Sequence, residues 1–167
     1  APDTCLLDAG VIPGLSLCIA VWVGKHMRTR LTNISVIPNV PGLPGVEDPD
    51  PRYAGRYEAR LAKAVDINQF GVNIITLRPG AFSANRHWHE AEDEMVYVLD
   101  GSPTLVDENG RHKLKVGDIV GFLAGEPNAH HIVNEEDREA TLIVVGSRKP
   151  GQETIHYPDD NFGPIRK

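Results

Sequence analysis

From residue 70 onward, short apolar runs rich in β-branched residues alternate with turn residues at intervals of about ten positions. The runs cover residues 70–77, 94–99, 103–107, 111–116, 119–124, 129–134 and 139–147. Turn pairs such as Asp100-Gly101 and Asn109-Gly110 separate them, and no stretch with a helical period lies between them. This pattern predicts an all-β fold, an antiparallel sandwich or barrel, rather than a parallel α/β sheet.

The first third of the chain has a different pattern. Residues 38–55 are rich in proline and glycine, so we expect a linker in which neither a strand ladder nor a helix can form. Residues 56–66, RYEARLAKAVD, have the composition of a helix and are the only segment for which we predict one. These patterns divide the chain into an N-terminal arm (1–55), one β-barrel domain (56–157) and a C-terminal tail (158–167).

An apolar run at residues 14–24 resembles a membrane anchor at first sight. It is too short, because a helix that spans a bilayer needs roughly 20 apolar residues. Basic residues follow this run instead of preceding it, which argues against a secretory signal. An extra strand, a poorly specified leader and a natural start at Met27 are the alternatives that the sequence leaves open.

Composition narrows the classes of function. A chain of 167 residues, 41% hydrophobic, suffices for one domain with a core but is short for two. Its net charge is −6 and its basic residues are scattered, so we expect no nucleic-acid partner and no membrane association. The two cysteines, Cys5 and Cys18, form no disulfide framework and no zinc site, which favours a reducing, cytoplasmic location. Metal or acid–base chemistry must then depend on His, Asp and Glu.

The stretch RHWHEAEDEMVYVLDG, residues 86–101, concentrates such residues. His87 and His89 are two positions apart, so on an extended strand both imidazoles point to one face. Glu94 begins the next apolar run, and a solvated turn of acidic residues (90–93) folds it back beside them. His130 and His131 follow much later, and because adjacent strand residues face opposite ways, only one of them can join the cluster.

Two longer segments resemble the two motifs of the cupin superfamily. Residues 80–101 are similar to the first motif, with its glycine, His-x-His pair, glutamate and closing glycine, and residues 117–134 are similar to the second. The short spacing between them is typical of compact bacterial single-domain members. The resemblance covers roughly residues 68–157. It implies a cupin-type jelly-roll β-barrel, also called a double-stranded β-helix, with an irregular N-terminal arm.

The resemblance also implies that His87, His89, Glu94 and His130 bind one divalent metal ion inside the barrel. Two extra residues before His130 depart from the second motif, so His131 stays an alternative ligand. Nitrogen and oxygen donors without sulfur suit Fe, Mn, Ni, Co or Zn. Four protein ligands leave two positions of an octahedral ion for two adjacent substrate oxygens, whose negative charge the ion stabilises as a Lewis acid.

We therefore predict a metal-dependent enzyme that acts on a small oxygenated metabolite, such as a sugar phosphate or a keto or hydroxy acid. An isomerase or epimerase and a dioxygenase fit equally well, and similar cupins are described as sugar-phosphate isomerases. Glu94 is the candidate catalytic residue, as a ligand and a proton shuttle. The alternative is a non-catalytic module that binds or senses a sugar-like molecule.

Other side chains are candidates for contacts with the substrate. Arg78 and Arg86 can recognise a carboxylate or phosphate, although surface salt bridges are an equal interpretation. Tyr97 and Phe122 lie on core strands, where they either line a pocket or pack. Since a small barrel has exposed strand edges to cover, we also expect a homodimer.

Overall fold

A computed structural model of the chain describes residues 19–23, 26–30, 37–42, 51–161 and 163–167. The chain divides into two units, residues 1–36 and residues 37–167. In the first unit, β1 (Ile19–Val23) and β2 (His26–Arg30) form an antiparallel hairpin, which agrees with the extra strand that the sequence left open. Cys5 and Cys18 lie outside the described residues. Within the described ranges, no helix is both long enough and apolar enough to cross a bilayer.

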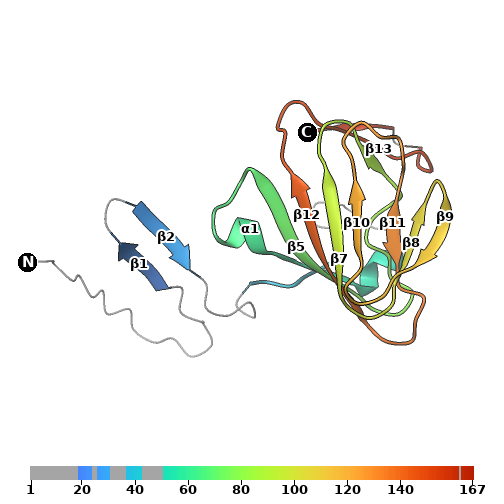
Figure 1. Cartoon of the computed structure of the whole chain (residues 1–167), viewed down its shortest axis with the longest axis horizontal. Coiled ribbons are helices and arrows are strands. Elements are labelled where there is room, and N and C mark those ends of the chain that lie inside the picture. Colours follow the sequence, from blue (N-terminus) through green and yellow to red (C-terminus); the bar gives the residue numbers. More distant parts are fainter. Residues whose placement is uncertain (1–18, 24–25, 31–36, 43–50, 162) are drawn as a thin grey trace, which may run out of the picture. The chain divides into compact units, whose positions relative to one another are not determined.

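The second unit consists mainly of strands and is called the barrel unit below (Figure 1). Its strands are β3 (Val40–Pro41), β4 (Arg56–Arg60), β5 (Phe70–Leu77), β6 (Trp88–His89), β7 (Glu94–Asp100), β8 (Thr104–Asp107), β9 (Gly110–Lys113), β10 (Ile119–Phe122), β11 (His131–Val133), β12 (Ala140–Ser147), β13 (Thr154–His156) and β14 (Ile165–Arg166). Its helices are the 3₁₀ helix η2 (Pro51–Gly55) and the four-residue α1 (Leu61–Ala64). Each of the seven apolar runs contains a strand, so the all-β prediction is confirmed.

The strands pair antiparallel in three sheets. The largest has the order β10-β7-β12-β5-β4-β3, and Figure 1 shows β5, β12, β7 and β10 side by side in it. Two three-stranded sheets, β11-β8-β9 and β14-β13-β6, complete the barrel unit. Non-consecutive neighbours such as β7 and β12 give the jelly-roll arrangement that was expected.

The core follows from the alternation of side chains along the central strands. Val96 and Val98 on β7 and Leu142 on β12 are at most 2% exposed and face the same side of the large sheet. Buried side chains of β5, β8, β10 and β11 pack with them. The same face continues toward the other end of β7, where Glu94 takes the place of an apolar residue.

The predictions for residues 38–66 were wrong in two respects. The expected linker contains β3, which pairs with β4, and η2, whose Tyr53 is 2% exposed and stacks on Phe82. The expected helix is mostly β4, and only Leu61–Ala64 are helical. Pairing of β4 with β5 therefore overrides local helix propensity, which is a weak preference compared with tertiary packing.

A buried ion pair explains why the charged residues of β4 led to the wrong prediction of a helix. Arg56 and Glu58 are 4% and 5% exposed, and the guanidinium donates to the Glu58 carboxylate at 3.1 Å. Arg56 also donates to the carbonyl oxygens of Ser83 (2.6 Å) and Gly42 (2.9 Å), while Arg60 donates to the other oxygen of Glu58. Partners inside the barrel unit thus satisfy these charges, which on a helix would face solvent.

Candidate metal centre

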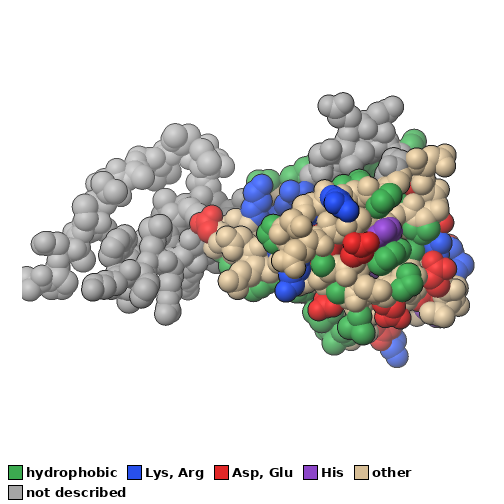
Figure 2. Space-filling model, turned by 90° about the horizontal axis from the view of Figure 1, so that it is seen from above, with side chains coloured by type: hydrophobic (Ala, Val, Ile, Leu, Met, Phe, Trp, Pro, Cys, Tyr) green, Lys and Arg blue, Asp and Glu red, His purple; other side chains and the backbone are tan. Residues whose placement is uncertain are grey.

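Four side chains from two distant segments converge in the barrel unit. His87 and His130 form an isolated antiparallel bridge in which each backbone N–H donates to the other carbonyl, at 3.1 Å and 2.9 Å. Their ring centroids lie 5.1 Å apart, and the ring of His89, on β6, lies 5.0 Å from that of His87. Glu94 begins β7, and the donor atoms of His87, His89 and Glu94 lie within 4.8 Å of one another. Figure 2 shows one face of the barrel unit, on which basic, acidic and hydrophobic side chains are interspersed.

The three imidazoles use their Nδ1 atoms to bond to oxygens outside the cluster. These bonds join His87 to the Asn85 carbonyl (2.8 Å), His89 to the Glu153 carboxylate (2.9 Å) and His130 to the Asn128 carbonyl (3.1 Å). An imidazole that donates its Nδ1 proton has a fixed ring orientation and presents the Nε2 lone pair on its other side. This is the arrangement found around metal-binding histidines.

The inward atoms of the cluster have no matching donor among the described residues. Nε2 of His130 lies 3.4 Å from Oε1 of Glu94, and Nε2 of His89 lies 3.8 Å from the other carboxylate oxygen. A neutral imidazole has a single N–H, and a carbonyl oxygen only accepts, so the proton of His130 stays on Nδ1. Nitrogen and carboxylate lone pairs therefore face one another, and a shared cation would satisfy them.

Protonation states in the cluster suit a metal ion. Burial lowers the pKa of His87 to about 4, so this imidazole is neutral at pH 7. Burial raises the pKa of the Glu94 carboxyl, but the contact with His130 and the electrostatic influence of His87 and His89 outweigh burial and lower the pKa to about 2. Metal ligands must be deprotonated, and both groups already are at neutral pH. Three imidazole nitrogens and one carboxylate thus fit a divalent transition metal.

The structure separates the two adjacent histidines of the second motif. Nδ1 of His131 lies 3.1 Å from the carbonyl oxygen of Ala84, and its ring packs edge-on against Phe82, with centroids 5.8 Å apart. Its side chain therefore lies on the other side of the strand from His130, which faces Glu94. The geometry favours His130 over the alternative ligand His131.

Both candidate arginines form ion pairs away from the cluster. Arg78 pairs with Glu139 at 3.4 Å and lies over the ring of Tyr57, with side chains on both sides of the pair 56% exposed. Arg86 pairs with Asp159 at 2.8 Å and with Glu108 at 3.1 Å. The structure brings neither guanidinium to the four converging side chains, in keeping with the salt-bridge interpretation.

The two aromatic candidates differ. Phe122 pairs with Glu94 across β10 and β7, stacks on the ring of His130 with centroids 3.3 Å apart, and lines a small cavity beside it. Tyr97 lies three positions after Glu94 on β7, so its side chain points to the opposite face of the sheet. Phe122 therefore belongs to the surroundings of the cluster, and the structure does not bring Tyr97 to it.

Two further carboxylates lie beside the cluster: the ligand atoms of Glu92, Glu153 and His89 are within 4.8 Å of one another. Sequence reasoning missed Glu153. Glu153, 1% exposed, accepts from His89 and from the backbone N–H of Ala91. The sequence placed Glu92 in a solvated turn, with a position beside the metal as the alternative. Glu92 is 3% exposed, and it accepts from the backbone N–H of Lys149 (2.8 Å) and from Arg148 (3.2 Å). Glu153 is separated from the first motif by about 60 positions, and no local pattern marks it.

Taken together, an antiparallel jelly-roll barrel with three inward imidazoles and one carboxylate defines a class of metal-binding β-barrels. Residues 73–146 match the cupin domain family. A cupin-superfamily sugar phosphate isomerase from Silicibacter pomeroyi DSS-3 is 38% identical, with a TM-score of 0.72, over 80% of this chain and 88% of that one. The chain belongs to the cupin superfamily.

Two further solved structures are similar. One, described as a candidate sugar phosphate isomerase from Acidithiobacillus ferrooxidans, is 36% identical with a TM-score of 0.59, over 62% of this chain and 65% of that one. A polyketide cyclase from Streptomyces resistomycificus is 16% identical with a TM-score of 0.59, over 81% of this chain and 89% of that one, and shows a common fold alone. No curated protein matches the chain significantly.

Proposed function

We propose that the chain is a metal-dependent isomerase of a small phosphorylated sugar. The observation that carries the proposal is the convergence of Nε2 of His89, Nε2 of His130 and the carboxylate of Glu94, to which no other described residue donates. Isomerisation beside a carbonyl creates negative charge on oxygen, and a bound divalent ion supplies Lewis-acid stabilisation of that charge. The 38% identity to a sugar phosphate isomerase supports the class of substrate.

The chain's own residues supply a rigid site. Bonds at Nδ1 fix the orientation of the three imidazoles before any ligand arrives, and Phe122 packs flat against His130. Glu94 is ionised at neutral pH because its pKa is about 2. Such a carboxylate is a good ligand but a weak base, so we assign Glu94 to holding the metal rather than to removing a proton from carbon.

The pair His130 and His131 offers a matched test. His130→Ala should lose bound metal and isomerisation, because it removes an inward nitrogen, whereas His131→Ala should retain both. Metal content is measured by elemental analysis, and aldose–ketose interconversion of a panel of sugar phosphates is followed by NMR. If His130→Ala keeps the metal content and activity of the unmodified protein, the ligand assignment is wrong.

Oxygen uptake and thermal stability, measured beside isomerisation, separate the competing functions. Oxygen consumption without isomerisation would assign the site to a dioxygenase. Sugar binding that stabilises the protein thermally, with no turnover by the metal-loaded chain, would assign it to a binding module. Either result overturns the isomerase proposal.

A further inference from the structure

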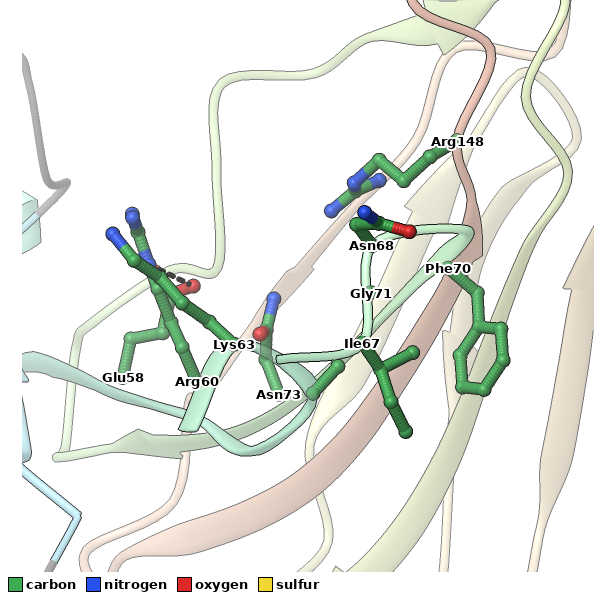
Figure 3. Close-up of a pocket in the computed structure, with 10 residues that line it drawn as sticks. Glu58, Arg60, Lys63, Ile67, Asn68, Phe70, Gly71, Asn73 and Arg148 are labelled. Carbon is green, nitrogen blue, oxygen red and sulfur yellow. Dashed lines mark hydrogen bonds and ion pairs between the residues drawn. The ribbon is translucent and has the colours of Figure 1, made fainter. Parts of the chain in front are cut away.

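A basic pocket lies beside β5 in the barrel unit (Figure 3). Its volume is about 310 Å³. Three cationic side chains and two amides line it: Arg60, Lys63, Arg148, Asn68 and Asn73. Figure 3 shows that the long side chains of Arg60, Lys63 and Arg148 extend to one side of the ribbon, whereas those of Ile67 and Phe70 point the other way. Cationic groups that converge on one cavity form a site for an anion.

The single acidic residue among those that line the pocket does not neutralise it. Glu58 accepts from Arg56 with one carboxylate oxygen and from Arg60 with the other. Arg56 does not line the pocket, and it matches the charge of Glu58. Lys63 is exposed and forms no ion pair within the described part of the chain. Glu92 matches the charge of Arg148, so Arg60 and Lys63 leave the pocket with an excess of positive charge.

Two glycines let Arg148 reach into the pocket. Gly71 and Gly146 are directly opposite each other on β5 and β12. A Cβ atom placed on Gly71 would come within 2.4 Å of Nη2 of Arg148, so any side chain there would displace the guanidinium. Nη1 of Arg148 donates to Glu92 at 3.2 Å. Nη2 has no hydrogen-bond partner among the described residues and remains available to a ligand.

The pocket and the metal centre lie on one face of the large sheet. Glu94 pairs with Gly146, and Gly146 pairs with Gly71, so the three positions form one row across β7, β12 and β5. Adjacent strands are about 4.8 Å apart, which puts Gly71 on the order of 10 Å from Glu94. Neither glycine has a side chain. No side chain of the sheet therefore lies in this row between Glu94 and the guanidinium of Arg148.

We propose that this pocket binds the phosphate group of a phosphorylated sugar whose oxygenated end lies at the metal centre. The proposal rests on the isomerase function proposed above and adds the residues that select the phosphate. Arginine recognises phosphate oxygens with paired N–H donors, and lysine adds a compact charge. Arg148, Lys63 and Arg60 supply these groups, and the amides of Asn68 and Asn73 can donate to the remaining oxygens.

Binding of inorganic phosphate to the full chain tests the pocket directly. Lys63→Gln removes one charge from an exposed side chain and should weaken phosphate binding at least fivefold in calorimetric titrations. Lys115→Gln is the matched control, because Lys115 is an exposed lysine that does not line the pocket. The phosphate affinity of this variant should equal that of the unmodified protein. Equal phosphate affinities for Lys63→Gln and Lys115→Gln would overturn the proposal.

A second variant keeps every charge. Gly71→Ala should displace the Arg148 guanidinium and weaken phosphate binding, whereas Gly121→Ala, whose Cβ would meet nothing within 4 Å, should not. Unchanged phosphate binding by Gly71→Ala would contradict the role of Arg148.

Manganese(II) loaded at the metal centre allows the distance between the metal centre and the phosphate pocket to be measured. The paramagnetic relaxation of ³¹P in bound phosphate should report a separation on the order of 10 Å. A distance short enough for direct coordination would place the phosphate on the metal and overturn the pocket assignment.

The isomerase and pocket proposals fail separately. If the chain isomerises sugar phosphates and Lys63→Gln leaves their KM unchanged, the pocket proposal is wrong while the isomerase stands. If no sugar phosphate is turned over but phosphate binding still depends on Lys63, the isomerase proposal is wrong while the anion pocket stands.

Discussion

Two clusters of buried charged groups lie in the barrel unit, one around Arg56 and Glu58 on β4 and one around Glu94 and the three histidines. In the first, each carboxylate oxygen of Glu58 receives a guanidinium donor, and Arg56 has two carbonyl partners besides. In the second, the Nδ1 atoms are satisfied while the Nε2 and carboxylate atoms face one another without a donor.

The difference separates a structural polar cluster from a candidate functional one. Burial and charge are alike in the two, so neither property identifies the site. What distinguishes them is whether the inward atoms already have partners in the folded chain, because unpaired acceptors cost free energy unless a ligand satisfies them. The predictions below test this contrast, from the largest expected effect to the smallest.

Removing one partner of the structural cluster should have the largest effect. Glu58→Ala leaves the Arg56 guanidinium buried without its counter-charge, and loss of one partner of a buried pair costs about 3–5 kcal/mol. Urea denaturation measures the free energy of unfolding, and elemental analysis of the folded protein should show unchanged metal. The control Glu135→Ala breaks an exposed pair with Arg111 and should cost much less than Glu58→Ala, because solvent screens exposed ion pairs. Equal losses for the two variants would contradict the contrast.

Metal removal should destabilise the functional cluster alone. A ligand present at a hundred times its dissociation constant stabilises the folded state by about 2.7 kcal/mol. A chelator should therefore lower the unfolding free energy of the metal-loaded protein by roughly this amount and leave His87→Ala unchanged, since that variant lacks a donor nitrogen. A chelator effect that persists in His87→Ala would show that the stabilising metal lies elsewhere.

The carboxylate behind His89 should tune metal affinity. Glu153→Gln retains an oxygen that can accept the Nδ1 proton but removes the negative charge, and changes of this kind cost about 10–100-fold in metal affinity. Competition with a coloured chelator measures the affinity. Glu90→Gln is the control, because Glu90 bonds to His156 and not to a residue of the cluster, and it should bind metal normally.

Acid should weaken the metal-free protein through His87. Its pKa in the folded protein, about 4, lies below the ordinary value of 6.5, so the unfolded chain binds the proton first. The contribution of His87 to stability is therefore full well above pH 6.5 and falls as the pH drops toward 4, by about 1.6 kcal/mol between pH 6.5 and pH 5. Denaturation at a series of pH values measures this slope, which His87→Asn should flatten. A slope that survives the substitution would assign the acid sensitivity to other groups.

Arg78→Ala should have the smallest effect. Its partner Glu139 is as exposed as Arg78 itself, and exposed pairs contribute about 0–1 kcal/mol. Phosphate titration and denaturation should both match the unmodified protein within that range. A loss of phosphate affinity would return Arg78 to the candidates for substrate binding.

Much of the fold could be predicted because strands and turns are local patterns. The apolar run 70–77 coincides with β5, and turn pairs at 100–101 and 109–110 separate β7, β8 and β9. Residues 56–60 could not be assigned in this way. Arg56, Glu58 and Arg60 alternate along the strand as charged residues, and an alternating charged face predicts exposure unless the partners inside are known.

The site could be predicted only in part for the same reason. His87, His89 and Glu94 are close in the sequence, and strand alternation places the two imidazoles together. Glu153 and Arg148 reach the cluster and the pocket through strand pairing over more than 50 positions. Single residues at such separations follow no period, so the sequence contains no signal for their proximity.

The outward bonds of the three imidazoles are of two kinds, and this matters for divergence among related chains. Main-chain carbonyls hold His87 and His130, and no single replacement of an amino acid removes a main-chain carbonyl. Among the three imidazoles, only that of His89 is held by a side chain, the carboxylate of Glu153. A single substitution at position 153 can therefore alter the electron density of the His89 ring, while the other side chains of the cluster keep their positions.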